Sequence, residues 1–205
     1  MTLALTPQAL KSWQRCQRQY ELTRVRALGW PQNPKNFQLG TAVHALLDYQ
    51  AKGYDVTPLL TAANPDVKKV YEVLLASDWA QAPLIASEWS FSLPVAGHWL
   101  HGRIDRIVQD PRDSQKIVIL DWKTGTATPS MPETDWQTQV YCYAVMRLQS
   151  ALNLTLTPED LSLCYVELHP EAQVPKITEI PYSRGRFEAM TTELAELVSA
   201  FSRAS

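Results

Sequence analysis

The sequence lacks the features that mark secreted and membrane-bound proteins. No stretch approaches the ~20 consecutive apolar residues that a bilayer-spanning helix requires. The first twenty residues lack a basic segment followed by an apolar run and a small-residue cleavage site. We therefore expect no signal peptide and a cytoplasmic location. The sequence also contains no internal repeat, low-complexity tract or linker.

Cysteine is scarce and scattered. The three cysteines, Cys16, Cys142 and Cys164, are odd in number and widely spaced, and no CxxC pair occurs. This pattern argues against a disulfide framework and against a cysteine-based zinc site. We expect three ordinary thiols, buried or half-buried.

An overall basic charge is also missing, since the formal net charge is −2. Its distribution is uneven: residues 1–40 carry six cations against one anion, and residues 41–205 carry 13 against 20. A basic N-terminal segment could bind phosphates, with Arg15 and Arg18 beside Lys11 on one side of a helix. The alternative is an ordinary solvated helix face.

The 205 residues suffice for one well-packed domain and are too few for two large ones. The patterns predict a mainly helical part over 1–80, a central part over 84–153, and C-terminal strands and a helix over 154–205. Helices are expected over 7–20, 41–50, 65–77, 133–152 and 184–201, strands over 84–93, 99–109, 116–123, 161–168 and 174–181, and a loop over 29–40. We predict one α/β domain in which 116–120, apolar on both faces, forms a central strand.

The most informative segment runs from His101 to Gly125. Alternation along a strand places Asp121 and Lys123 on one face, at the end of an apolar stripe. If the preceding strand is the hairpin partner, Asp105 converges with Asp121, and two carboxylates brought together repel unless a cation neutralises them. Such oxygen ligands suit Mg²⁺ or Mn²⁺, which activate water for phosphodiester cleavage. The alternative is a surface ion pair at a strand end.

Other polar residues are weak signals individually. His44 lies at the edge of an inward helix face, where a histidine is usually a core residue. Glu88 lies in an apolar strand and either joins the acidic cluster or belongs to its rim. Gln139 and Tyr143 share a helix face at i, i+4 spacing, as ordinary residues of a helix edge also would.

The order of these residues is more specific than any one of them. The motifs are Gly40-x-x-x-His44, Glu88, Gly102-Arg103-Ile104-Asp105, Asp121-Trp122-Lys123-Thr124-Gly125 and Gln139-x-x-x-Tyr143. This series resembles the RecB-like branch of the PD-(D/E)XK nucleases, which includes the CRISPR-associated exonucleases. Residues 16–20 (CQRQY) resemble the C-P-R-x-Y element of that branch, with Gln17 in place of proline. The resemblance covers roughly residues 6–145.

The resemblance implies a fold, a site and an activity. It implies a restriction-endonuclease-like mixed sheet flanked by helices, with His44, Asp105, Asp121 and the Trp122 carbonyl as ligands of Mg²⁺ or Mn²⁺. Lys123 would be the catalytic lysine, Glu88 an acidic residue of less fixed role, and Gln139 and Tyr143 would contact DNA. The expected activity is that of a DNA exonuclease in repair or recombination, acting on single strands or DNA ends.

Two expectations qualify this assignment. Several relatives hold a [4Fe–4S] cluster with four cysteines, and because no cysteine follows Cys164, we expect no iron–sulfur cluster here. The alternative function is a catalytically silent module that keeps the fold and binds DNA or a protein partner. A helicase or another repair protein is the kind of partner that the resemblance suggests.

Overall fold

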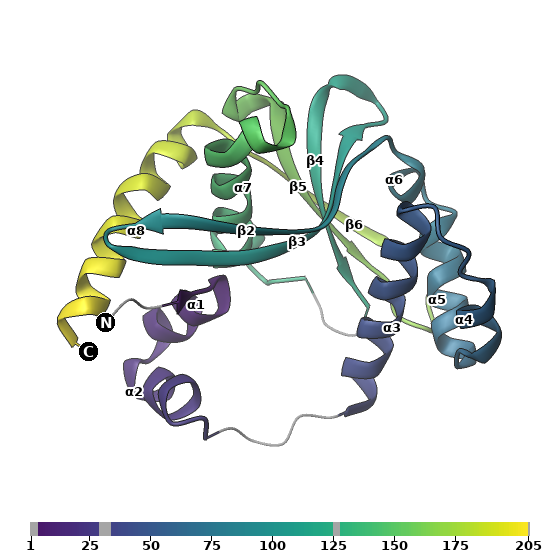
Figure 1. Cartoon of the computed structure of the whole chain (residues 1–205), viewed down its shortest axis with the longest axis horizontal. Coiled ribbons are helices and arrows are strands. Elements are labelled where there is room, and N and C mark those ends of the chain that lie inside the picture. The colour runs from purple at the N-terminus through teal and green to yellow at the C-terminus, as the bar shows by residue number, and fades with distance from the viewer. Residues whose placement is uncertain (1–3, 29–33, 125–127, 205) are drawn as a thin grey trace.

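The computed structural model describes residues 4–28, 34–124 and 128–204, and its centre is a mixed sheet (Figure 1). The strands are β1 (Ala4–Leu5), β2 (Leu84–Val95), β3 (His98–Asp110), β4 (Asp113–Lys123), β5 (Leu161–Glu167) and β6 (Lys176–Pro181). The sheet order is β1-β3-β4-β5-β6, and β2 lies off this path, paired with β3. The pairs β2–β3, β3–β4 and β5–β6 are antiparallel, whereas β4–β5 and β1–β3 are parallel. The expected α/β architecture with a mixed central sheet is confirmed.

Helices flank the sheet on both faces. They are α1 (Pro7–Arg15), α2 (Gln17–Tyr20), α3 (Pro34–Ala51), α4 (Thr57–Ala62), α5 (Pro65–Leu75), α6 (Asp78–Gln81), α7 (Trp136–Leu148) and α8 (Arg184–Ala204). Short turns complete the chain: a π-helical turn (Glu21–Val25) and 3-10 turns at Pro132–Thr134, Gln149–Leu152 and Pro158–Asp160. No helix in the described ranges is both long enough and apolar enough to span a membrane.

Strand β4 shows why the sheet is covered on both sides. Ile117 and Ile119 belong to one buried cluster, with α1, α7, α8 and the β2–β3 hairpin. Val118 and Leu120 belong to a second cluster, with α3, α5 and α6. Because successive side chains of a strand point to opposite faces, an uninterrupted apolar run fits a strand buried on both. The central strand expected from this run is confirmed.

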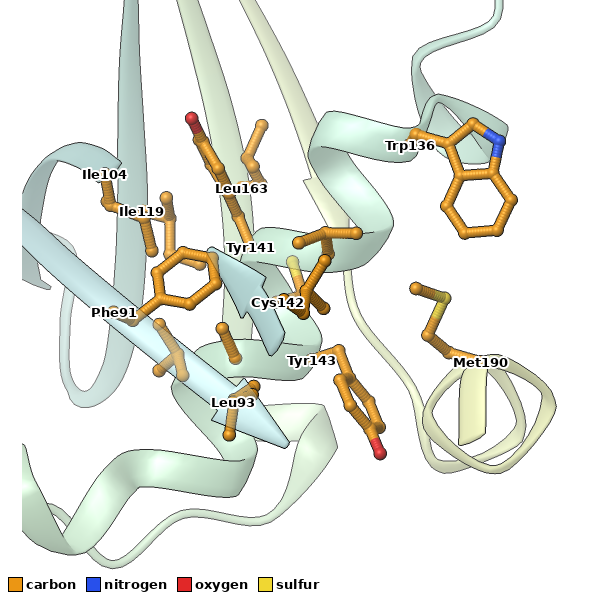
Figure 2. Packing of buried hydrophobic residues seen from close by; sticks show 14 of the residues in the cluster. Phe91, Leu93, Ile104, Ile119, Trp136, Tyr141, Cys142, Tyr143, Leu163 and Met190 are labelled. Atoms are coloured by element: carbon orange, nitrogen blue, oxygen red, sulfur yellow. The ribbon is translucent and has the colours of Figure 1, made fainter. Parts of the chain in front are cut away.

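The first cluster joins the long β2–β3 hairpin to the helices beside it (Figure 2). Phe91 of β2 contacts Tyr141 of α7 edge to face, with ring centroids 6.1 Å apart. Met190 of α8 closes the same cluster. α7 also connects β4 to β5, because two parallel neighbours require a crossover element. This packing fixes the start of α7 next to the end of β4.

Two local predictions were wrong. The helix expected over 7–20 is interrupted at Cys16, whose backbone is extended (φ −166°, ψ 108°) and whose Sγ accepts a hydrogen bond from the Gln19 N–H at 3.4 Å. A side chain that caps a new helix offers the backbone an alternative to continuing the old one. Arg18 therefore does not share a continuous helix face with Lys11 and Arg15.

The loop expected over 29–40 is wrong from residue 34 onwards. Residues 29–33 lie outside the described ranges, and α3 begins at Pro34. Proline is favoured at the first position of a helix, where its missing N–H costs no hydrogen bond. The signal interpreted as a loop thus marks a helix start. The strand pair β1–β3 and the short helices α4 and α6 were not anticipated.

Candidate active site

The end of β4 presents a buried acid and a lysine on one face. Asp121 is only 2% exposed, and its Oδ1 lies 2.6 Å from Lys123 Nζ. Burial, and then the nearby charge of Asp105, raise the pKa of the Asp121 carboxyl above its ordinary value, while Lys123 acts in the opposite direction. The ammonium is thus the nearest counter-charge to a carboxylate that has lost almost all contact with water.

Helix α7 supplies a third member of this group. Asp135 caps the helix by accepting a hydrogen bond from the Gln137 N–H at 2.9 Å. The Gln137 side chain then donates to Asp121 Oδ2 and accepts a hydrogen bond from Lys123 Nζ at 3.0 Å. A single amide therefore bridges the acid and the lysine from the other side.

Strand β3 brings a second carboxylate to the same place. Arg106 pairs with Leu120 across the β3–β4 hairpin, and Asp105 and Asp121 are the next residues of the two strands beyond this pair. Asp105 Oδ2 accepts a hydrogen bond from the Trp122 N–H at 2.9 Å. The hairpin pairing on which the sequence argument depended is present.

His44 reaches the site from α3. Its Nε2 lies 2.9 Å from the Trp122 carbonyl oxygen, and its Nδ1 lies 3.5 Å from Asp105 Oδ1. Burial by itself would lower the pKa of His44, but the hydrogen bond and charge of Asp105, with the charge of Asp121, raise it to about 9. A cation of either kind, a proton or a metal, is favoured at this imidazole.

Glu88 completes the acidic group from β2. Its φ of 48° lies in the left-handed region, which is unusual for a residue other than glycine. Strained backbone of this kind concentrates at functional sites. Glu88 Oε2 lies 2.8 Å from Arg103 Nε. One ligand atom each from His44, Glu88 and Asp105 lies within 4.8 Å of the others.

This donor set fits a divalent metal ion. Carboxylate oxygens and an imidazole nitrogen are ligands that Mg²⁺ and Mn²⁺ accept, with water or phosphate oxygens in the remaining positions. Glu88 thus offers a ligand atom close to those of both His44 and Asp105. Asp121 lies beside that group, with its oxygens turned towards Lys123 and Gln137, and the Trp122 carbonyl faces His44.

One cavity of about 850 Å³ opens at this site. His44, Asp105, Lys123 and Gln137 line it, and so does Lys11 of α1. The Lys11 ammonium lies 2.5 Å from the Asp135 carboxylate, so α1 is tied to the start of α7. This volume lies within the usual range of ligand-binding clefts.

The structure separates two overlapping motifs on α7. Gln139 and Tyr143, the expected pair, do not line the cavity: Gln139 donates to the Glu133 carbonyl, and the Tyr143 hydroxyl accepts from Arg147 at 2.9 Å. Gln137 and Tyr141 line it instead. They have the same Q-x-x-x-Y spacing two residues earlier, so the sequence contained this signal without distinguishing the two registers.

Of the basic residues predicted in the N-terminal segment, Lys11 lines the cavity and Arg15 and Arg18 do not. Arg15 is exposed at the end of α1, and Arg18 of α2 is exposed and lies 2.6 Å from the Glu21 carboxylate. Arg103 of β3 also lines the cavity, although its place in the sequence motif predicted no role for it. The strand alternation that relates position 103 to Asp105 was the available signal.

The cysteines lie in three different environments. Cys16 is exposed between α1 and α2, Cys142 is buried in the first cluster, and Cys164 is buried in the second cluster on the other sheet face. Burial raises the pKa of Cys142 and of Cys164 to about 12, which keeps both thiols protonated. Neither buried thiol is therefore a reactive group.

Comparisons with known proteins bear on the family and the fold of this chain. The family model described as the PD-(D/E)XK nuclease superfamily matches residues 4–204. A proposed exonuclease from Eubacterium rectale shares the fold at a TM-score of 0.63 and 9% identity, over 98% of this chain and 80% of the other. The structure of SSO0001 matches at a TM-score of 0.47 and 16% identity, over 98% and 76%. No curated protein matches significantly. The chain belongs to the PD-(D/E)XK nuclease superfamily.

Proposed function

We propose that the protein is a divalent-metal-dependent nuclease that hydrolyses DNA phosphodiester bonds, as an exonuclease of the RecB-like branch in DNA repair or recombination. The observation that carries this proposal is that His44, Asp105 and Lys123 line a single cavity, with Glu88 in the candidate ligand group and Asp121 paired with Lys123. A cytoplasmic location and a helicase or repair partner are part of the proposal. The chain would act as one domain without an iron–sulfur cluster.

In this proposal the metal ligands are His44, Asp105, Asp121 and the Trp122 carbonyl, and Glu88 is an additional acidic ligand. A bound Mg²⁺ or Mn²⁺ would supply Lewis acidity and lower the pKa of a water molecule. Lys123 would orient the attacking water and stabilise the negative charge that develops on the phosphate. Asp121 holds the ammonium in position, since it is its nearest carboxylate.

The supporting amide of the site is Gln137 in this proposal, with Tyr141 beside it. The basis is its two hydrogen bonds, to Asp121 and from Lys123, which Gln139 does not make. Orientation by such neighbours typically accounts for 10–100-fold in activity at metal sites. In this proposal Arg15 and Arg18 contact the DNA backbone outside the cavity. Replacing both should reduce the salt dependence of DNA binding.

Replacement of Asp121 tests the proposed site. Asp121→Asn keeps the shape of the side chain and removes the charge, so we expect a folded protein that has lost cleavage by roughly 100-fold or more. The measurement is the rate of cutting of labelled DNA, with circular dichroism as the fold control. Cutting by Asp121→Asn at the parent rate would show that this active site is wrong. DNA binding by the parent protein without any metal-dependent product would support the silent module instead.

A further inference from the structure

Arg103 occupies an unusual position beside the proposed metal ligands. It lies two residues before Asp105 on β3, so the two side chains leave the same face of the strand about 7 Å apart. His101 precedes Arg103 by the same interval, and all three residues line the cavity. The row therefore leads from the outer part of the cavity to the candidate metal site.

The partner of Arg103 is itself one of the candidate ligands. Arg103 Nε lies 2.8 Å from Glu88 Oε2, and Glu88 belongs to the group that offers ligand atoms within 4.8 Å of one another. Glu88 is largely enclosed, with a side chain 20% exposed, and lies on strained backbone. The guanidinium thus neutralises a carboxylate that faces His44 and Asp105.

The ion pair is poorly suited to a purely structural role. The Arg103 side chain is 67% exposed, and pairs with so much solvent access contribute little to stability. A guanidinium can also bind phosphate through two parallel hydrogen bonds, which makes phosphate a strong competitor for the carboxylate. The exposed face of Arg103 is open to the same cavity that would receive DNA.

We propose that Arg103 binds a backbone phosphate of the incoming DNA strand and releases Glu88 when it does so. The freed carboxylate then completes the ligand group with His44 and Asp105. Strand binding and metal binding at this site reinforce each other, because each favours the arrangement in which Arg103 has left Glu88. The inference rests on the proposed nuclease function and adds a phosphate-binding residue that couples substrate to metal.

Binding to a single-stranded oligonucleotide in EDTA tests the phosphate contact without cleavage. Arg103→Gln should weaken binding by roughly 3–10-fold at moderate salt and lower the slope of log affinity against log salt by about 0.7, the effect of one lost phosphate contact on a single strand. Lys116→Gln is the matched control, because Lys116 is an exposed cation at the opposite end of β4 from Lys123. An Arg103→Gln protein that binds like Lys116→Gln would overturn the proposal.

Arg103→Lys serves as a second variant if Arg103→Gln does not fold. Lysine keeps the charge but cannot form two parallel hydrogen bonds to one phosphate. The proposal predicts that this variant keeps the salt slope of the parent and binds the oligonucleotide more weakly. Affinity equal to that of the parent would contradict the paired contact.

Calorimetric titration with Mn²⁺ in the absence of DNA tests the release of Glu88. Arg103→Gln should bind Mn²⁺ several-fold more tightly than the parent, and this gain should be lost when Glu88→Gln is also present. A gain that persists in the double variant would be a general charge effect and would overturn the exchange. If the parent cuts DNA normally while the oligonucleotide-binding and Mn²⁺-titration tests both fail, only this inference is wrong. A parent protein that neither binds nor cuts DNA would contradict the proposed function itself.

Discussion

The side-chain amide of Gln137 donates a hydrogen bond to Asp121 Oδ2, which ties the first turn of α7 to the end of β4. The same amide accepts a hydrogen bond from Lys123. Because the ends of Gln137 are both engaged, rotation of the side chain would break two contacts with charged groups. Hydrogen bonds to charged partners contribute more than neutral ones, about 1.5–3 kcal/mol each.

This relationship distinguishes the two overlapping motifs of α7. We expect Gln137→Ala to lower kcat for DNA cleavage by roughly 10–100-fold, because Lys123 and Asp121 lose their common partner. Gln139→Ala is the matched control and should cut at nearly the parent rate, since the Gln139 side chain donates to the Glu133 carbonyl and not to Asp121. The opposite ranking of the two variants would restore the motif to Gln139 and Tyr143.

Metal binding should stabilise the fold measurably. Mn²⁺ at about 100 times its Kd would add roughly 2.7 kcal/mol, which in a chain of this size raises Tm by about 5–10 °C. His44→Ala and Asp105→Asn should lose most of this rise, because each removes a candidate ligand. Thermal melts with and without EDTA measure the effect. An unchanged Mn²⁺ shift in both variants would place the metal elsewhere.

Glu167 gives the fold a dependence on acidic pH. Hydrogen bonds from Thr128, first its backbone N–H and then its hydroxyl, hold the pKa of Glu167 at about 2, below the ordinary 4.5. A carboxyl whose pKa is lowered by folding stabilises the folded state above its unfolded pKa and loses that contribution as the pH falls towards the folded value.

Glu167→Gln should therefore be destabilised by about 2 kcal/mol at pH 7. The difference from the parent should shrink between about pH 4.5 and 2. Urea unfolding at several pH values measures both quantities. A difference that stays constant over this range would mean that the charge of Glu167 is not responsible.

Gly102 is required by close packing within the β2–β3 hairpin. A Cβ at this position would lie 2.4 Å from the Phe91 ring, which occupies the space that a side chain would take. We expect Gly102→Ala to lower the free energy of unfolding by about 1–3 kcal/mol, the usual effect of overpacking. The same substitution should lower the free energy of unfolding by a smaller amount in a Phe91→Ala background. Equal costs in the two backgrounds would exclude this contact as the cause.

The sequence predicted the parts of the site that depend on strand geometry. Asp121 and Lys123 share a face because side chains alternate along any strand, and Asp105 joins them because β3 and β4 form a hairpin. Neither relation depends on details of packing. The apolar run before Asp121 was also sufficient to predict a strand covered on both faces.

The remaining features depend on contacts that sequence spacing does not determine. Gln137 and Gln139 have identical spacing to a tyrosine, and only the packing of α7 against β4 and β5 decides which faces the site. The break at Cys16 depends on one sulfur atom accepting a hydrogen bond. The role proposed for Arg103 depends on its ion pair with Glu88 of the neighbouring strand, and sequence spacing does not predict that pair.

Cleavage of end-labelled single- and double-stranded DNA by the parent protein and by Lys123→Ala is the most direct test of the account. The assay is run with Mn²⁺, with Mg²⁺ and with EDTA, and circular dichroism shows that both proteins are folded. The account predicts metal-dependent cutting by the parent, loss of that cutting in Lys123→Ala, and a product ladder that begins at a DNA end. Undiminished cutting by Lys123→Ala, or no cutting of either substrate by the folded, metal-bound parent, would contradict it.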